Sequence, residues 1–192
     1  MKTMVHSCVL LFFLHTHSPV KAESFNVTLD PDQTKITFTL GATLHTVHGV
    51  ATVKSGRLQF DSKTGKANGD VLIEAQSLTT KNKGRDEKMH EKVLETKKYP
   101  FIIFNPQKVV GELKPEGENV LSIHGTMEIH GATQELDFST TAQISNRKFK
   151  AKTDFWIPYV EWGMKDPSVF LLKVEKKVHV MIEASGELNS IK

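Results

Sequence analysis

Cysteine is almost absent from this chain of 192 residues. The one cysteine, Cys8, lies in an N-terminal stretch that we expect to be removed, so the mature chain would have no thiol. Such a chain forms no disulfide bond and has no cysteine nucleophile. The remaining residues, roughly 170, would bury about 70% of the surface of the unfolded chain, so a hydrophobic core can stabilise the fold instead.

Long apolar runs are also missing, apart from the short run CVLLFFL at residues 8–14. Lys2 precedes this run, and Val20-Lys21-Ala22 follows it with the small residues typical of a cleavage site. We therefore predict a secretory signal peptide at residues 1–22, the alternative being a disordered tail. The run is too short to span a bilayer. We expect an exported protein without a stable membrane anchor, in the periplasm or in the medium.

A clear excess of charge is missing as well. The 25 basic residues fall to 23 without Lys2 and Lys21, against 22 acidic residues. Proteins that bind nucleic acid normally carry a clustered basic face, so this balance argues against a nucleic-acid partner.

The motifs of common enzymes and metal sites are absent too. The chain has no G-x-S-x-G sequence, no phosphate-binding glycine loop and no HExxH sequence. Asp86 and Glu91 could be an acid–base pair, but a helix cap and a solvated charge explain them better. Among the nine histidines, His124 and His130 lie about 20 Å apart along one predicted strand, too far to share an ion. We predict no catalytic residues, no metal and no cofactor.

The dominant pattern that is present is an alternation of apolar and polar residues, typical of half-buried β-strands. It is clearest at residues 36–40, 121–130 and 178–184. Turns of hairpin length join these stretches, and such turns connect antiparallel strands. The pattern predicts an all-β domain of about eight to ten antiparallel strands, built as a two-sheet sandwich or a closed barrel.

One stretch differs, namely RDEKMHEKVLETKKYP at residues 85–100. Its apolar residues are spaced for a helix, which predicts a short helical segment at about residues 86–95 with Asp86 as its N-cap. Tyr99-Pro100 would end this segment and lead into the next strand. We expect Met89, Val93 and Leu94 to point inward across one end of the domain.

Three motifs follow one another in a characteristic order. The first is Val47-His48-Gly49 with a later Leu58-Gln59-Phe60-Asp61, the second is the stretch at 85–100, and the third is HGTMEIHGAT at 124–133. Together they resemble the YceI-like family of secreted bacterial proteins, with a similarity that runs from about residue 25 to 186. The stretch PYVEWGMKDPSVFLLKV at 158–174 departs from the family pattern.

The resemblance implies a lipocalin-like, eight-stranded antiparallel β-barrel with the short helical segment at one end, formed by a single domain at residues 23–192. It also implies a bound long-chain amphiphile, a polyisoprenoid or an isoprenoid quinone, and it favours the periplasm. We therefore expect an exported lipid-binding protein for transport, storage or sequestration. The alternatives are a ligand-free stress or interaction module with a filled core and, less favoured, a lipid-modifying enzyme. The oligomeric state stays open, with a homodimer among the options.

Apolar burial explains why such a protein would select a long chain. One buried CH₂ is worth about 0.8 kcal/mol, so roughly ten carbons are needed to offset an association cost of about 4–15 kcal/mol. The inward residues could equally pack against one another, because an eight-stranded barrel can be filled or hollow. Aromatic residues near a barrel end could contact a headgroup or plug the end. The predicted lipid-binding residues are Phe38, Leu40, Leu58, Phe60, Val71, Ile73, Met89, Val93, Leu94, Ile102, Phe104, Leu121, Ile123, Met127, Ile129, Phe138, Trp156, Trp162, Val180 and Ile182.

Overall fold

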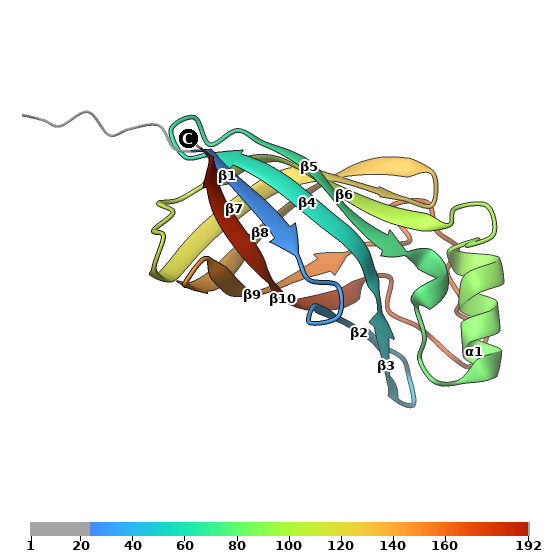
Figure 1. Ribbon diagram of the computed structural model, residues 1–192. Helices are drawn as coiled ribbons and strands as arrows, with labels where there is room; N and C mark the ends of the chain where they lie inside the picture. The colour runs from blue at the N-terminus through green and yellow to red at the C-terminus, as the bar shows by residue number, and fades with distance from the viewer. Residues whose placement is uncertain (1–23, 192) are drawn as a thin grey trace, which may run out of the picture.

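The computed structural model describes residues 24–191 (Figure 1). The predicted signal peptide at residues 1–22 lies outside the described residues. The strands are β1 (Ser24–Leu29), β2 (Lys35–Gly41), β3 (Thr46–Ala51), β4 (Val53–Asp61), β5 (Ala67–Glu74), β6 (Phe101–Val110), β7 (Gly117–Ile129), β8 (Ala132–Ser145), β9 (Lys148–Ile157) and β10 (Val178–Ile191). Between β5 and β6 lie the short 3-10 turn η1 (Ala75–Ser77), the helix α1 (Lys83–Lys88) and the π-helical turn η2 (Met89–Val93).

These segments form a closed, antiparallel barrel of eight strands. β1 and β2 both pair with β10, along its second and first halves, while β4 pairs with β1 and β3 with β2. β1 and β2 together therefore make up one interrupted strand of the barrel, and β3 and β4 make up a second one. The other strands pair in chain order, and the pairing of β1 with β10 closes the barrel. The predicted barrel is confirmed, and the sandwich alternative is excluded.

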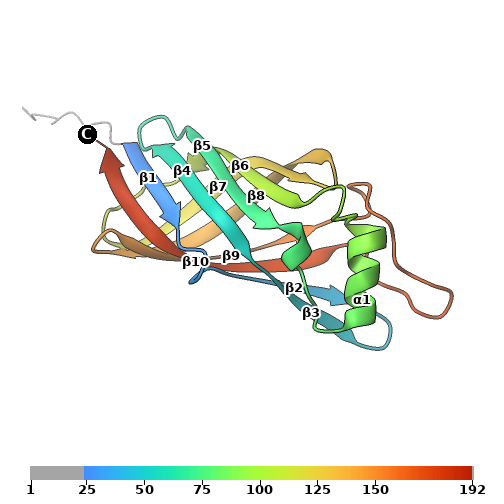
Figure 2. The ribbon, with the colours of Figure 1, turned by 45° about the vertical axis from the view of Figure 1, so that its right-hand side comes forward.

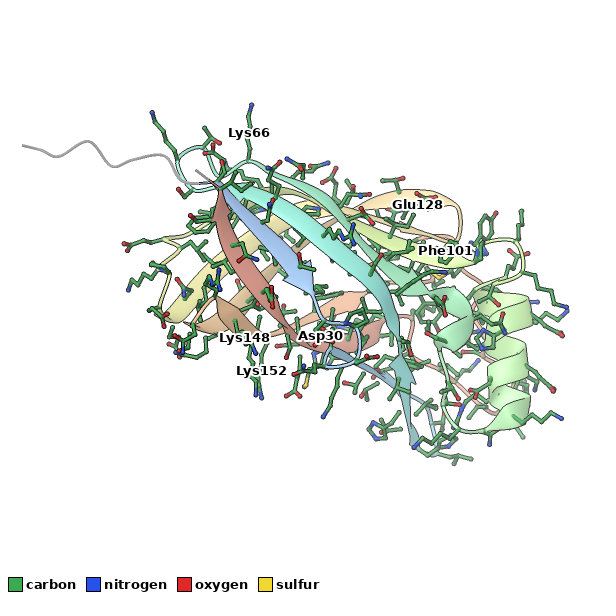
Figure 3. All side chains as sticks on the ribbon, viewed as in Figure 1. Asp30, Lys66, Phe101, Glu128, Lys148 and Lys152 are labelled. Atoms are coloured by element: carbon green, nitrogen blue, oxygen red, sulfur yellow. The ribbon has the colours of Figure 1, made fainter. Side chains whose placement is uncertain are left out.

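Turn chemistry explains where the strands break. Between β1 and β2 the Asp30 carboxylate accepts a hydrogen bond from the Asp32 amide at 3.0 Å, which is an Asx turn. Between β7 and β8, His130 and Gly131 both have positive φ, as the two central residues of a type I′ hairpin require. Charged side chains project away from the barrel into solvent, such as Lys152 on β9 and Lys66 in the turn between β4 and β5 (Figure 3).

The far end of the barrel, away from α1, is filled by side chains. Phe25, Phe60, Ile144, Phe149 and Leu188 form a buried cluster there. The rings of Phe25 and Phe60 stack with their centroids 6.4 Å apart. This end of the barrel matches the expectation of a filled core.

The helix lies at the opposite end, beside the ends of β2 and β3 (Figure 2). It begins earlier than predicted, because the Asn82 side chain is the N-cap and accepts a hydrogen bond from the Arg85 amide at 3.0 Å. The prediction that Asp86 caps the helix is therefore wrong. The Asp86 carboxylate instead accepts hydrogen bonds from the Thr79 hydroxyl at 2.7 Å and the Thr80 amide at 2.9 Å. These bonds fasten the helix to the segment that follows η1.

Replacing Asp86 with asparagine is expected to loosen this attachment and to lower the free energy of unfolding by about 1–2 kcal/mol, since charge-assisted hydrogen bonds are lost. Partial burial alone would raise the pKa of the Asp86 carboxyl, but hydrogen bonds from Thr80 and Thr79 outweigh it and hold that pKa below the ordinary 3.8. Because the pKa is lowered, the stabilisation is complete above the pKa of Asp86 in the unfolded chain. It is lost as the pH falls through the pKa of Asp86 in the folded protein.

The measurement is urea unfolding of both proteins at several pH values between 7 and 3. The stability gap between wild type and Asp86→Asn should be constant near neutrality and shrink at the acid end. Glu87→Gln serves as the control, because Glu87 is an exposed carboxylate on the same helix. A gap that persists unchanged at pH 3 would contradict the role assigned to the ionised carboxylate.

Candidate functional site: an apolar cavity beneath the helix

The half of the barrel nearest α1 contains a partly open cavity of about 560 Å³. Ligand pockets in proteins typically measure about 300–1,000 Å³. The walls come from seven strands and from the helical segment, with the loop between β9 and β10 adding part of the rim. The barrel is therefore hollow at one end and filled at the other.

Part of the predicted lipid-binding set faces this cavity. Met89, Val93 and Leu94 all line it, so the helical segment presents its apolar side inward, as its spacing indicates. The other predicted residues that line the cavity are Phe38, Leu40, Ile73, Ile102, Met127, Ile129, Val180 and Ile182.

The remaining predicted residues lie elsewhere. Phe60 belongs to the cluster at the filled end. The Phe138 ring lies between Phe104 at 5.3 Å and Phe155 at 5.1 Å, and of these three stacked or tilted rings only Phe155 lines the cavity. The other predicted residues that do not line the cavity are Leu58, Val71, Leu121, Ile123 and Trp162.

Trp156 lies on the outer face of β9 and is 47% exposed. Its ring packs against His179 at 4.8 Å, with the Lys177 ammonium 4.6 Å from the ring centroid. This position is outside the cavity, so the structure does not bring Trp156 to the site. The reason is strand parity, because its neighbours Phe155 and Ile157 are the residues of β9 that point inward.

Several lining residues were missed by the sequence analysis. Ile36, Val47, Phe155 and Val178 follow the same alternation as the predicted residues and could have been found by extending it. The rim residues had no such signal, because they lie in the irregular loop between β9 and β10. They are Tyr159, Met164, Pro167, Val169, Leu172 and Val174.

Polar side chains gather on one side of the cavity, close to the start of α1. The Arg85 Nε donates a hydrogen bond to the Thr80 hydroxyl at 2.8 Å, and its Nη1 lies 3.4 Å from the His45 Nε2. Asn82 and Lys88 line the same side. The cavity thus combines apolar walls with one polar edge, an arrangement that matches an amphiphile.

Tyr159 anchors the loop between β9 and β10 at the rim. Its side chain is buried, and its hydroxyl donates a hydrogen bond to the Glu175 carbonyl oxygen at 2.8 Å. Burial, helped by the negative charge of Asp166, raises the pKa of Tyr159 to about 12. The hydroxyl therefore keeps its proton, and this hydrogen bond, throughout the physiological pH range.

No cluster of three or more His, Cys, Asp or Glu side chains suited to a metal ion occurs within residues 24–191. In the same part of the chain, no helix has the length and apolar character needed to cross a membrane.

Solved structures share this architecture. The chain is similar to a polyisoprenoid binding domain from Saccharophagus degradans implicated in plant cell wall breakdown, with 16% identity, 85% of this chain and 98% of that chain covered, and a TM-score of 0.68. It is similar to BcnA from Burkholderia cenocepacia, with 15% identity, coverages of 82% and 98%, and a TM-score of 0.65. A YCEI protein from Campylobacter jejuni matches with 17% identity, coverages of 100% and 99%, and a TM-score of 0.53. At these identities the likeness shows the fold alone.

The family follows from a comparison of sequence. No curated protein matches the chain. The family model described as the YceI-like domain, however, matches residues 27–185, which include all strands of the barrel in whole or in part and the three motifs. The resemblance drawn from those motifs is confirmed, and the chain belongs to the YceI-like family.

Proposed function

We propose that this protein binds a long-chain lipid, with the apolar tail inside the barrel. The observation that carries the proposal is the cavity of about 560 Å³ with almost wholly apolar walls. A small polar metabolite would need several convergent polar groups, which this interior lacks apart from one edge. A hydrocarbon tail gains about 0.8 kcal/mol for each CH₂ that it buries.

The polar edge suggests how the ligand is oriented. Arg85, His45 and Lys88 lie together at the helix end of the cavity. A polar headgroup would rest against these side chains, and the tail would extend along the apolar wall toward Phe155. The ligand class that we favour is a polyisoprenoid or an isoprenoid quinone. The similarity to a structure described as a polyisoprenoid binding domain supports this choice.

The biological role that we propose is transport, storage or sequestration of this lipid outside the cytoplasm, by binding rather than by catalysis. Export is supported by the signal-peptide pattern at residues 1–22, and the mature protein would be the single domain at 23–192. Among exported locations we favour the periplasm.

Native mass spectrometry of the protein purified from its own host tests this function. We expect an added mass that disappears after organic extraction and that returns when the stripped protein is offered an isoprenoid quinone or a polyprenol. The extract should contain a lipid of the same mass. Protein that is empty as purified, and stays empty with both probes, would contradict the proposal and favour a ligand-free module.

A further inference from the structure

Large apolar side chains are exposed at the cavity rim. Leu44, in the turn between β2 and β3, is 82% exposed, and Phe170 and Leu171, in the loop between β9 and β10, are 91% and 82% exposed. Val169, beside them, is also exposed. We call these four residues the apolar tip. Side chains of this size are usually buried, and exposed groups of them mark interaction surfaces.

The two loops that carry the apolar tip are joined to each other. The Thr43 amide donates to the Lys173 carbonyl oxygen and the Lys173 amide donates to the Thr43 hydroxyl, both at 2.9 Å. Within the second loop, Val169 and Leu172 exchange two backbone hydrogen bonds, of 2.9 and 3.1 Å, which place Phe170 and Leu171 at the end of a tight turn. The tip is thus a hydrogen-bonded structure that holds its apolar side chains outward.

The apolar tip is continuous with the cavity. Val169 belongs to both, and Leu172 directly follows the tip residue Leu171 and also lines the cavity. Ala42 and Val174, which form a bridge between the two loops, line it as well. Figure 2 shows the long loop before β10 projecting beyond α1, at the same end of the barrel as the turn between β2 and β3. A surface that covered the tip would therefore lie against the rim of the cavity.

Charge is distributed unevenly between this end and the rest of the barrel. Residues 81–92 and 161–177, which cover most of the helical segment, the residues just before it and most of the loop before β10, hold nine Lys and Arg residues against six Asp and Glu residues. The rest of residues 24–191 holds thirteen basic against fifteen acidic residues. The turn at residues 42–48 has no acidic residue. The end that carries the apolar tip is therefore the positive end of the protein.

We propose that the apolar tip docks onto an anionic lipid bilayer. Phe170, Leu171 and Leu44 would enter the boundary between headgroups and acyl chains, and the surrounding lysines would face the lipid phosphates. Docking in this way places the cavity rim against the membrane, so that a lipid tail passes between bilayer and cavity without crossing water. This purpose rests on the proposed lipid binding, whereas the docking itself does not require an occupied cavity.

The test is co-sedimentation of the lipid-stripped protein with vesicles of phosphatidylglycerol and phosphatidylethanolamine, compared with vesicles of phosphatidylcholine. Wild type should bind the anionic vesicles and bind the neutral vesicles clearly less. The double variant Phe170→Ser, Leu171→Ser should lose roughly a hundredfold in partitioning, about tenfold for each apolar side chain withdrawn from the bilayer. Its urea midpoint should match wild type, because both side chains are exposed.

The matched control is the double variant Val110→Ser, Val120→Ser, which removes two exposed apolar side chains from the opposite end of the barrel. It should bind the vesicles like wild type. Equal binding by the tip variant and wild type would overturn the proposal, as would a wild type that does not bind anionic vesicles. A wild-type dimer that the tip variant dissociates, without vesicle binding, would assign the tip to a second copy instead.

A failure of the docking proposal can be distinguished from a failure of the proposed lipid binding. Mass spectrometry of the isolated protein reports on the cavity, and co-sedimentation of the stripped protein reports on the tip. A protein that carries lipid but ignores vesicles would keep the carrier function and remove the docking. A protein that never takes up lipid but binds vesicles through the tip would keep the docking and remove the carrier function.

Discussion

Replacing Ile182 with tryptophan is expected to lower the affinity for a lipid tail about fiftyfold. Ile182 lies near the middle of β10, is only half-buried and lines the cavity, so an indole ring would project into the empty space. Displacing about three CH₂ groups at ~0.8 kcal/mol each costs about 2.4 kcal/mol, and every 1.4 kcal/mol is a factor of ten. The measurement is titration of the stripped protein with an isoprenoid quinone.

Met181→Trp is the matched control for this experiment. Met181 is the preceding residue of the same strand, and its side chain is 47% exposed on the outer face. The same ring introduced there leaves the cavity free, so the affinity should remain within about twofold of wild type. If both variants lost affinity equally, the effect would come from disturbance of β10 and the assigned cavity would be wrong.

Replacing Phe60 with alanine is expected to have the largest effect on stability, a loss of about 3–5 kcal/mol in the free energy of unfolding. Phe60 is 6% exposed and stacks on Phe25 in the filled end of the barrel. Removal of its ring leaves a new void among side chains that already interlock. Urea unfolding of the lipid-stripped protein measures the loss.

Phe38→Ala is the control variant, because it removes the same ring from the cavity end of the barrel. Phe38 lines the existing cavity and is only half-buried, so its removal enlarges a space that is already empty and should cost clearly less stability. The lipid affinities should rank in the opposite order, with Phe38→Ala impaired and Phe60→Ala close to wild type when folded. The reverse ranking in either measurement would place the lipid site at the wrong end of the barrel.

The sequence was sufficient to predict on which side of the barrel wall most side chains lie. Alternation along a strand separates Ile182 from Met181, because successive side chains point to opposite faces. The same rule could have excluded Trp156, which has the parity opposite to Phe155. The inward residues of the helical segment were also predictable, since Met89 and Val93 are four residues apart and share a helix face.

The position of each inward side chain along the barrel axis could not be predicted from this alternation. Phe38 and Phe60 have equivalent inward parity, yet one lines the cavity and the other fills the far end. The difference depends on the register between neighbouring strands, which pairs Phe60 with Phe25 and Phe38 with Gly49. Parity is a local property of one strand, whereas register is set by contacts between strands.

The start of α1 and the rim were missed for related reasons. Asp86 and Asn82 are both good N-cap residues, and only the hydrogen bonds of Asp86 to Thr79 and Thr80 show that its carboxylate is already occupied. The irregular stretch at 158–174 has no regular spacing of apolar residues from which its contacts could be inferred. Its place at the rim follows from its hydrogen bonds to the turn that precedes β3.

The double pairing of β10 makes the completion of the cavity depend on this one strand. β10 is the last strand of the described residues, and it joins β9 on one side to both β1 and β2 on the other. Every other neighbouring pair can form from a hairpin or nearby segments, but this seam brings together residues about 150 positions apart, a closure that is slow by comparison. Val178, Val180 and Ile182 also belong to the cavity wall, so this wall is incomplete until β10 has paired with its neighbours. Uptake of the proposed ligand therefore requires β10 to be in place, with its seam to β1 and β2 formed.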